Sequence, residues 1–451
     1  MSELFDFLKY CLGAKSDVNK VIAGIDWQML YSFAFKQALL GLCFDGIERL
    51  GKEYPEELKL NPIGRELLMT WMGKAQQIRR QNVKVNGVAA KLYSKFREDG
   101  LRCCILKGQG NALMYPNPYS RTPGDIDVWI DASRERIMEY AQKKFELGDN
   151  IRLQHLETSL DGVPVELHFF PCSMNNPIYH ARLQKWFRRK ADLQCSHIVG
   201  LPDVAGDIAI PTTAFNVIYQ LTHLYHHFFD EGIGMRQIID YYYVVCDFYK
   251  VYQNSSKITP SLFTIKEGST SHPDPLTLRG EGGNRPTRCS EPLRSKDGGA
   301  SKPSPNCAGW DRRGVSGDIA SDASVSSAFT TDSSASTALD VVQRELKYLG
   351  LGKFAGAVMY VLHEALGLSE EKMIVPMDEK RGRLLLAEIL DGGNFGRHFT
   401  KYAGFTHQSM GKKYFLKIWR NMHFVRYYPA EALCEPLFRT WHFFWRMKNK
   451  K

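Results

Sequence analysis

The chain has 451 residues, which is enough for two or three domains with a sizeable buried core. Apolar residues make up 44% and charged residues 24%, an ordinary balance for a globular protein. No run of about eighteen apolar residues is present, and the first residues lack the basic flank and continuous apolar stretch of a secretory signal. These features argue against a membrane-spanning helix and predict a cytoplasmic protein.

Positive charge is concentrated near the end of the chain. The net charge is +10, and residues 396–451 contain twelve Lys and Arg against Glu431 and Glu435, so this segment alone carries +10. A localised basic tail suggests an anionic partner. The ten cysteines include no C-x-x-C pair, so neither a cysteine-based zinc site nor a redox motif is indicated.

Helical patterns fill the first part of the chain, residues 1–98. They include a long polar-rich helix over 65–97, which Gly100 ends. A short apolar strand is predicted over 101–106, followed by one or two helical turns over 109–114. An irregular loop is then predicted from the prolines Pro116, Pro118 and Pro123.

The next elements predict a small sheet. A strand over 125–130 and a helix over 133–145 are followed by two alternating segments, 151–160 and 163–170, joined by Asp161-Gly162. Asp-Gly between two alternating segments is a strong signal for a β-hairpin turn. Together these elements predict an α+β fold, in which a domain with a small mixed sheet over 99–200 is flanked by helical regions.

Helical patterns return over 201–252 and are dense in aromatic residues. Between 253 and 338, Ser, Gly, Pro, Thr and Asp dominate, and too few large apolar residues are present to offset the entropy of ordering the chain. We therefore expect a disordered low-complexity insert there. Helical patterns resume over 339–451 and end in a basic aromatic tail, so the insert interrupts one helical domain.

Polar residues around the second predicted strand point to phosphate and metal chemistry. They are Lys107, Gly108, Arg121, Gly124, Asp125 and Asp127. Because side chains alternate along a strand, Asp125 and Asp127 share a face, where they repel each other unless a cation lies between them. Paired oxygen ligands suit Mg²⁺, or Mn²⁺ in its place. The glycine turn before a helix offers N–H groups to a triphosphate, and Arg121 could add a fork of donors.

A third acid lies on the second strand of the predicted hairpin. Apolar residues alternate with Glu166 and His168, so these two polar residues share the face opposite the core. Beside Asp125 and Asp127, Glu166 would complete a site for two metal ions and help to deprotonate an attacking hydroxyl. Attack on the α-phosphorus of a nucleoside triphosphate would then release pyrophosphate.

With these residues the sequence resembles the nucleotidyltransferase superfamily typified by DNA polymerase β and the aminoglycoside nucleotidyltransferases. It resembles more closely a family of uncharacterised bacterial nucleotidyltransferases, NTP_transf_5. The matching motifs are Lys107-Gly108, Tyr115-Pro116, Arg121, Gly124-Asp125-Ile126-Asp127, Glu166-Leu167-His168, His223, His226-His227 and the run from Gly232 to Asp240. The resemblance covers residues 1–250 and 339–430.

The resemblance implies a fold and a reaction class. It implies catalytic and metal-binding roles for Asp125, Asp127 and Glu166, and roles in binding the nucleoside triphosphate, such as ATP, for Lys107, Gly108, Arg121 and Gly124. The sequence departs from the superfamily at Gly108-Gln109, where Gly-Ser or Gly-Gly is usual. The serine that usually helps to hold the phosphates is therefore missing.

Several alternatives stay open at this point. A degenerate domain could bind nucleotide or a partner without chemistry. Arg121 could pair with a carboxylate, and Arg236 and Asp240 could form a helix pair or face the cleft. Three histidines lie at helical spacing, His223, His226 and His227; they could bind a metal, be buried structural residues or make polar contacts with Asp240. The tail could pack on the helical domain or contact a membrane surface or RNA. The acceptor could be a small molecule, a protein side chain or an RNA end.

Overall fold

The computed structural model describes residues 2–14, 17–253, 337–399 and 410–449. The predicted insert over 253–338 therefore lies, apart from its outermost residues, outside the described part of the chain. The fold described below belongs to a single unit formed by the segments on both sides of that insert.

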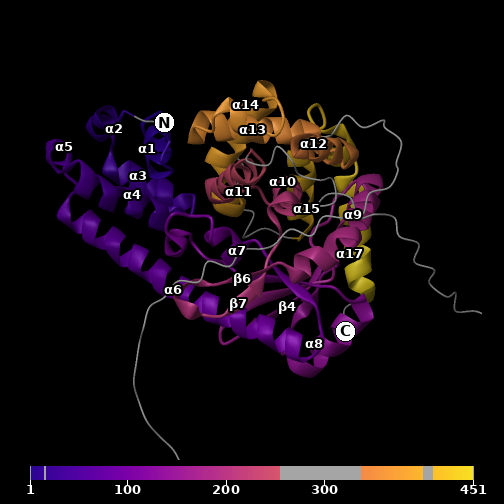
Figure 1. The fold of residues 1–451 in the computed structure, drawn as a ribbon. Coiled ribbons are helices and arrows are strands. Elements are labelled where there is room, and N and C mark those ends of the chain that lie inside the picture. Colours follow the sequence, from indigo (N-terminus) through magenta and orange to yellow (C-terminus); the bar gives the residue numbers. More distant parts are fainter. Residues whose placement is uncertain (1, 15–16, 254–336, 400–409, 450–451) are drawn as a thin grey trace, which may run out of the picture. The chain divides into compact units, whose positions relative to one another are not determined.

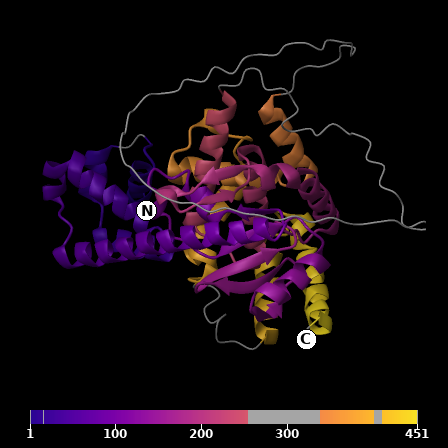
Figure 2. The ribbon, with the colours of Figure 1, turned by 60° about the horizontal axis from the view of Figure 1, so that its bottom comes forward.

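Six helices fill the first hundred residues, as the sequence pattern predicts (Figure 1). They are α1 (Ser2–Cys11), α2 (Val18–Gly24), α3 (Trp27–Lys36), α4 (Leu40–Glu53), α5 (Pro55–Leu60) and α6 (Arg65–Glu98). Asp17 and Asp26 fix the starts of α2 and α3, because their carboxylates accept the free N–H groups of Lys20 and Met29. The long helix α6 runs beside the strands that follow it (Figure 2).

A five-stranded mixed sheet follows, in agreement with the predicted α+β fold. Its strands are β1 (Cys103–Leu106), β2 (Ile126–Ile130), β3 (Leu147–Ile151), β4 (His155–Leu160) and β5 (Val163–His168), in the spatial order β1-β2-β5-β4-β3. The central pair, β2 and β5, is parallel, and the other neighbours are antiparallel. Helices α7 (Gly108–Ala112) and α8 (Arg134–Lys144) lie between the first strands in sequence.

The predicted hairpin forms around the predicted turn. Asp161 and Gly162 have φ angles of +50° and +73°, as a two-residue turn that matches the twist of the strands requires. The prediction of one strand over 151–160 is wrong, because β3 ends at Ile151 and β4 begins at His155. The sequence interpretation also missed α9 (Pro177–Ser196) and the two-stranded sheet of β6 (Ile198–Gly200) and β7 (Asp207–Ala209).

The two faces of the five-stranded sheet pack into different cores. One face buries apolar residues such as Val128 and Leu167 in a core that also contains residues of α6 and α8. The other face belongs to a larger core, where Trp129 stacks on Phe215 with ring centroids 6.0 Å apart. Phe215 lies on α10 (Thr213–Asp230), so the face that also carries Asp127 is turned towards this helix.

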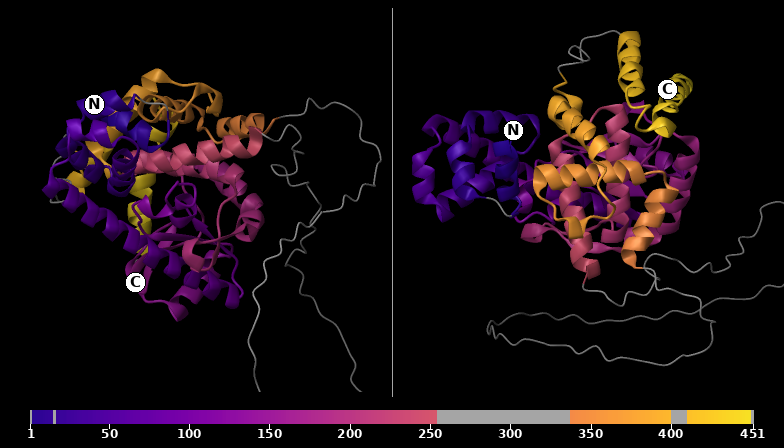
Figure 3. Two further views of the ribbon diagram at one scale, coloured as in Figure 1. Left: turned by 60° about the vertical axis from the view of Figure 1, so that its left-hand side comes forward. Right: turned by 90° about the horizontal axis from the view of Figure 1, so that it is seen from above.

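Helices also form the remainder of the described chain. They are α11 (Met235–Gln253), α12 (Ala338–Tyr348), α13 (Gly352–Leu366), α14 (Glu379–Gly392), α15 (Met410–Met422), α16 (Pro429–Ala432) and α17 (Glu435–Asn449). Figure 3 shows α13 and α14 in orange; α13 packs against α11, and α14 packs against α13. None of the helices within the described ranges is both long and apolar enough to span a bilayer.

The C-terminal helix α17 has two apolar faces in different surroundings. Trp445 lies over the guanidinium of Arg134, 5.2 Å from the ring centroid, so one face packs on the sheet domain. Leu437, Trp441 and Phe444 are exposed on the other face, with exposed fractions of 73%, 50% and 62%. The predicted packing of the tail therefore accounts for only part of its aromatic surface.

Candidate functional site

Three predicted acids converge at the parallel pair of strands. Asp127 on β2 lies directly opposite Glu166 on β5, and Asp125 precedes Asp127 by two residues. One carboxylate oxygen from each acid lies within 4.8 Å of one from each of the others. The alternation of strand side chains explains the first pair, and the register of β2 against β5 brings in the third acid. The three acids that the sequence singles out thus form one cluster.

Two cationic side chains hold the most deeply buried acid. Lys107 Nζ lies 2.9 Å from Asp127 Oδ2, and His168 Nε2 lies 2.9 Å from Asp127 Oδ1. His168 Nε2 also lies 3.2 Å from Glu166 Oε2. Asp127 is 2% exposed, so these contacts satisfy a carboxylate that water barely reaches.

The charges of the cluster shift one another's pKa values. The charge of Asp127, together with partial desolvation, raises the pKa of Asp125 to about 6. Burial would raise the pKa of Asp127, but Lys107 and the hydrogen bond from His168 lower it. Burial would lower the pKa of His168, but its hydrogen bonds to Asp127 and Glu166 raise it to about 9. The carboxylates of Asp125 and Asp127 therefore repel each other, and a bound cation would reduce this repulsion.

A cleft of about 460 Å³, partly open to solvent, lies against this cluster. It is lined by all of the predicted phosphate-binding residues and two of the acids: Lys107, Gly108, Arg121, Gly124, Asp125 and Asp127. Lys107 and Gly108 both have positive φ, +53° and +39°, at the turn into α7. A side chain at position 108 would be strained in that conformation, which explains the glycine. Helix α10 supplies the opposite wall through Gln220 and His223.

Arg121 lines the cleft, but its guanidinium is held by a carboxylate. Its Nε and one terminal nitrogen donate to the two oxygens of Asp240, each at 2.8 Å, and the Tyr115 hydroxyl donates to Asp240 Oδ1 at 2.7 Å. Arg121 is 5% and Asp240 5% exposed. The pair is thus a buried, bidentate salt bridge that fixes the proline-rich loop to α11.

Arg236 is the cleft arginine without such a carboxylate partner. One terminal nitrogen donates to the carbonyl of Thr122 at 2.9 Å, and the guanidinium lies 5.5 Å from the centroid of the Phe395 ring. Arg236 Nε has no hydrogen-bond partner within the described residues. The predicted pairing of Arg236 with Asp240 on α11 is wrong: no ion pair within 4.0 Å joins them in the described structure, because Arg121 takes Asp240.

Gln109, the departure from the usual Gly-Ser turn, does not line the cleft. Its side chain is buried and donates to Asn86 Oδ1 on α6. The amide therefore ties α7 to the long helix and leaves the phosphate side of the turn to backbone groups. Where the superfamily usually has the hydroxyl of a serine, this chain has an amide that makes a buried hydrogen bond to Asn86.

The histidines of α10 form a chain of contacts that starts at Lys107. Lys107 Nζ lies 2.8 Å from His223 Nε2, and His223 Nε2 lies 3.0 Å from His227 Nε2. Burial, followed by the charge of Lys107, lowers the pKa of His223, so this ring is a neutral acceptor. Asp240 accepts from Arg121 and Tyr115, so the alternative in which these histidines contact Asp240 does not hold within the described residues.

The sequence interpretation missed His155. It lies on β4 directly opposite His168, with its Nδ1 3.3 Å from Glu166 Oε2. The predicted turn at Asp161-Gly162 already fixed this pairing. A two-residue turn pairs the residues that lie equally far before and after it, and His155 lies as far before the turn as His168 lies after it. Counting back from the turn would have placed His155 opposite His168, two residues along the strand from the partner of Glu166.

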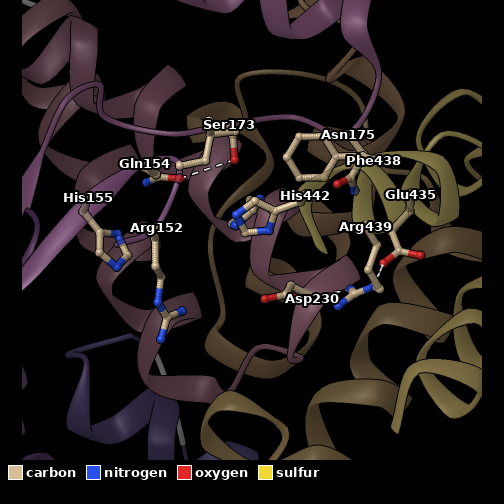
Figure 4. Close-up of a pocket in the computed structure, with 12 residues that line it drawn as sticks. Arg152, Gln154, His155, Ser173, Asn175, Asp230, Glu435, Phe438, Arg439 and His442 are labelled. Atoms are coloured by element: carbon tan, nitrogen blue, oxygen red, sulfur yellow. Dashed lines mark hydrogen bonds and ion pairs between the residues drawn. The ribbon is translucent and has the colours of Figure 1, made fainter. Parts of the chain in front are cut away.

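A second cavity, of about 660 Å³ and partly open to solvent, begins at His155 (Figure 4). Arg152, Gln154 and His155 line one side, and α17 lines the other through four residues: Glu435, Phe438, Arg439 and His442. Asp230, at the end of α10, is held there by Lys417 Nζ at 3.1 Å and by Arg439 at 2.9 Å. Helix α17, which begins more than 200 residues after Asp230, therefore forms one wall of a cavity next to the acidic cluster.

The acidic cluster has the ligands that a divalent cation requires. Asp125, Asp127 and Glu166 offer hard oxygen atoms at a mutual spacing of at most 4.8 Å, and Mg²⁺ is bound through one or two carboxylates together with waters and substrate phosphates. Asp125 is also exposed to the cleft. The donor set thus fits Mg²⁺ or Mn²⁺.

Comparison with known proteins agrees with the chemistry of these residues. The model of a family described as "uncharacterised nucleotidyltransferase" matches residues 23–252, about half of the chain. The match runs from before α3 to the last turn of α11, and so contains the five-stranded sheet, the acidic cluster and, apart from Phe395, the residues that line the cleft. Comparison with curated proteins and with solved structures finds no match.

Proposed function

Because the chain belongs to this family of nucleotidyltransferases, we propose that it transfers a nucleoside monophosphate from a nucleoside triphosphate to an acceptor hydroxyl and releases pyrophosphate. The observation that carries the proposal is the convergence of Asp125, Asp127 and Glu166 within 4.8 Å at the edge of a cleft. Three converging carboxylates repel one another and so do not stabilise a fold by themselves. They are, however, suitable ligands for the divalent cations of phosphoryl transfer.

The cleft is suited to a triphosphate. Lys107, Arg121 and Arg236 are the cations that line it. Arg236 has an Nε–H that no described residue accepts. Gly108 and Gly124 expose backbone there without a side chain in the way, since a Cβ at Gly124 would meet only Arg236, at 3.8 Å. We assign phosphate contacts to Lys107, Gly108, Gly124 and Arg236. Arg121, held by Asp240, keeps the intervening loop in place.

In the proposed reaction the hydroxyl oxygen of the acceptor attacks the α-phosphorus. The bond from that phosphorus to its bridging oxygen breaks, and pyrophosphate leaves. Divalent cations held by Asp125, Asp127 and Glu166 would neutralise phosphate charge and favour loss of the hydroxyl proton. Glu166 accepts that proton at its carboxylate, on the side of the cluster nearer to His155. The positive charge of Lys107, which lies next to Asp127 and lines the cleft, would stabilise negative charge on the phosphates.

The second cavity is the proposed acceptor site. It begins at His155, whose Nδ1 lies 3.3 Å from the carboxylate of Glu166, so an acceptor bound there would lie next to the acidic cluster. Its walls carry arginine, histidine and carboxylate groups, which suit an acceptor with several hydroxyl or amino groups.

The test is pyrophosphate release by the full chain with each nucleoside triphosphate, Mg²⁺ and fractionated lysate as a source of acceptor. We expect Asp127→Asn to lower release by at least about 1000-fold, because it removes a charged ligand of the divalent cations that would neutralise the reacting phosphates. Asp131→Asn, at the end of the same strand and away from the cleft, is the matched control. Equal release by wild type and Asp127→Asn would remove the acidic cluster from the mechanism.

A binding module without chemistry is the second candidate, because Gln109 bonds Asn86 and no hydroxyl takes its place beside the phosphates. Calorimetry with the nucleoside triphosphates and Mg²⁺ would support this alternative if binding occurs while no pyrophosphate is released with any acceptor fraction.

A further inference from the structure

The cluster continues beyond the three acids into a group of mixed ligands. His155 Nδ1 lies 3.3 Å and His168 Nε2 lies 3.2 Å from the same oxygen, Glu166 Oε2. One ligand atom from each of these three residues lies within 4.8 Å of one from each of the others. The strands impose this arrangement, because the register of β4 and β5 sets the two rings side by side with centroids 5.0 Å apart.

His155 has no structural explanation of its own. It is 8% exposed, and neither ring nitrogen makes a hydrogen bond within the described residues. Its nearest carboxylate oxygens are Glu166 Oε2, 3.3 Å from Nδ1, and Glu157 Oε1, 3.9 Å from Nε2. A buried imidazole that makes no hydrogen bond costs free energy, because buried polar groups in proteins normally make one. Its Nδ1 is directed at Glu166, so a cation at that position would give the ring the partner that the protein does not.

We propose that His155, Glu166 and His168 bind a transition-metal ion such as Zn²⁺, in a site that shares Glu166 with the Asp125 and Asp127 site. Two imidazoles and one carboxylate are a ligand set typical of Zn²⁺ with an open position, whereas oxygen ligands alone suit Mg²⁺. A carboxylate shared by two ions is also what a pair of ions about 4 Å apart requires.

This inference rests on the proposed function only in that Glu166 is common to both sites. His168 Nε2 contacts oxygens of Asp127 and Glu166, so the proton on this nitrogen leaves when the ring binds the ion. Gln154 Nε2 lies 3.3 Å from His168 Nδ1, on the other side of the ring. The proposed metal site borders the second cavity, since His155 also lines that cavity (Figure 4).

The test is equilibrium dialysis of the full chain, freed of metal by a chelator, against Zn²⁺ and separately against Mg²⁺. His155→Gln is the variant of choice, because His155 makes no hydrogen bond that the substitution would break. We expect Zn²⁺ affinity to fall by more than about 100-fold and Mg²⁺ affinity to stay unchanged. His197→Gln is the matched control, a histidine whose Nδ1 lies 3.0 Å from the Ile210 carbonyl, outside the cluster.

A spectroscopic readout identifies the ligands without reference to activity. Cu²⁺ bound to the wild type should show coupling to imidazole nitrogen in pulsed electron paramagnetic resonance, and His155→Gln should lose the part due to one ring. Unchanged Zn²⁺ affinity and unchanged coupling in His155→Gln would overturn the site. Pyrophosphate release is measured on the same samples. Zn²⁺ binding without release would defeat the proposed function alone, and release with Mg²⁺ but no His155-dependent Zn²⁺ binding would defeat the second site alone.

Discussion

Lys107 Nζ lies 2.9 Å from Asp127 Oδ2. A metal ion bound to Asp127 would therefore share this carboxylate with the ammonium group of Lys107. The charges of Asp127, Asp125 and Glu166 raise the pKa of Lys107 despite the opposing effect of its burial, so the lysine stays charged. In the absence of divalent cations, Lys107 and His168 are the groups that compensate the buried acid.

Substitution Lys107→Met should therefore lower the free energy of unfolding by about 3 kcal/mol without divalent cations, because it leaves a buried carboxylate short of a partner. Addition of Mg²⁺ should restore part of the loss. Chemical unfolding with and without Mg²⁺ measures both effects. Lys91→Met, which breaks an exposed ion pair with Asp161, is the control and should change nothing measurable. A loss in Lys107→Met that Mg²⁺ leaves untouched would speak against a cation at Asp127.

The salt bridge between Arg121 and Asp240 should matter for stability. Asp240→Asn leaves a buried guanidinium with one neutral acceptor in place of a bidentate carboxylate, and we expect a loss of about 3–5 kcal/mol in the free energy of unfolding. Urea unfolding of the variant gives this value. Glu379→Gln, which removes the partner of the exposed Arg383, is the comparison and should be neutral. Similar values for both variants would contradict the structural role given to Arg121.

Arg236 should bind phosphate. Arg236→Gln removes a charged donor from the cleft, and we expect the dissociation constant of a nucleoside triphosphate to rise about 10- to 100-fold, equivalent to about 1.5–3 kcal/mol for hydrogen bonds to a charged group. Binding of a fluorescent triphosphate analogue measures it. Arg136→Gln, on α8 and exposed, is the control. A triphosphate affinity that Arg236→Gln leaves unchanged would assign the phosphates to another part of the cleft.

Glu431 should make stability depend on pH. Its carboxylate is 1% exposed and accepts the N–H groups of Asn175 and Asn176 at 2.5 and 3.2 Å. Burial raises the pKa of Glu431 from 4.5 to about 7. Between these values the folded protein keeps a proton that the unfolded chain has lost, so the free energy of unfolding falls as pH rises, by about 1.4 kcal/mol per unit of pH at most.

Glu431→Gln removes this titration. Urea unfolding at pH 5 and pH 8 should therefore show a smaller fall in stability for the variant than for the wild type, with the difference on the order of 3 kcal/mol or less. Glu371→Gln, at an exposed position, should follow the wild type. Identical pH dependence of wild type and Glu431→Gln would mean that the carboxylate stays ionised in the folded protein.

The pattern of residues predicted the local part of the site well. Asp125 and Asp127 share a face because strand side chains alternate, and the turn at Asp161-Gly162 follows from the preference of Asp-Gly for positive φ at both positions. These are properties of neighbours in sequence. They need no knowledge of how the chain returns upon itself.

The remote contacts could not be predicted in the same way. The parallel pairing of β2 with β5 places Glu166 opposite Asp127, but pairing order is set by how helices cover the two faces and not by either strand alone. Arg121 could reach phosphate or a carboxylate on the sequence alone, and the position of Asp240 on a helix more than 100 residues later decides between them. Helix α9 was missed although Asn176 and Pro177 carry the signals of a helix start.

The junction of α10 with α17 has a consequence for how this protein could diversify. The family match ends at residue 252, yet Arg439 on α17 reaches back to Asp230 and four residues of α17 line the second cavity. Exchange of the last helix between relatives would thus alter what enters beside His155 and leave the carboxylates untouched. Under the proposed function, acceptor specificity and chemistry would then depend on separate stretches of the chain.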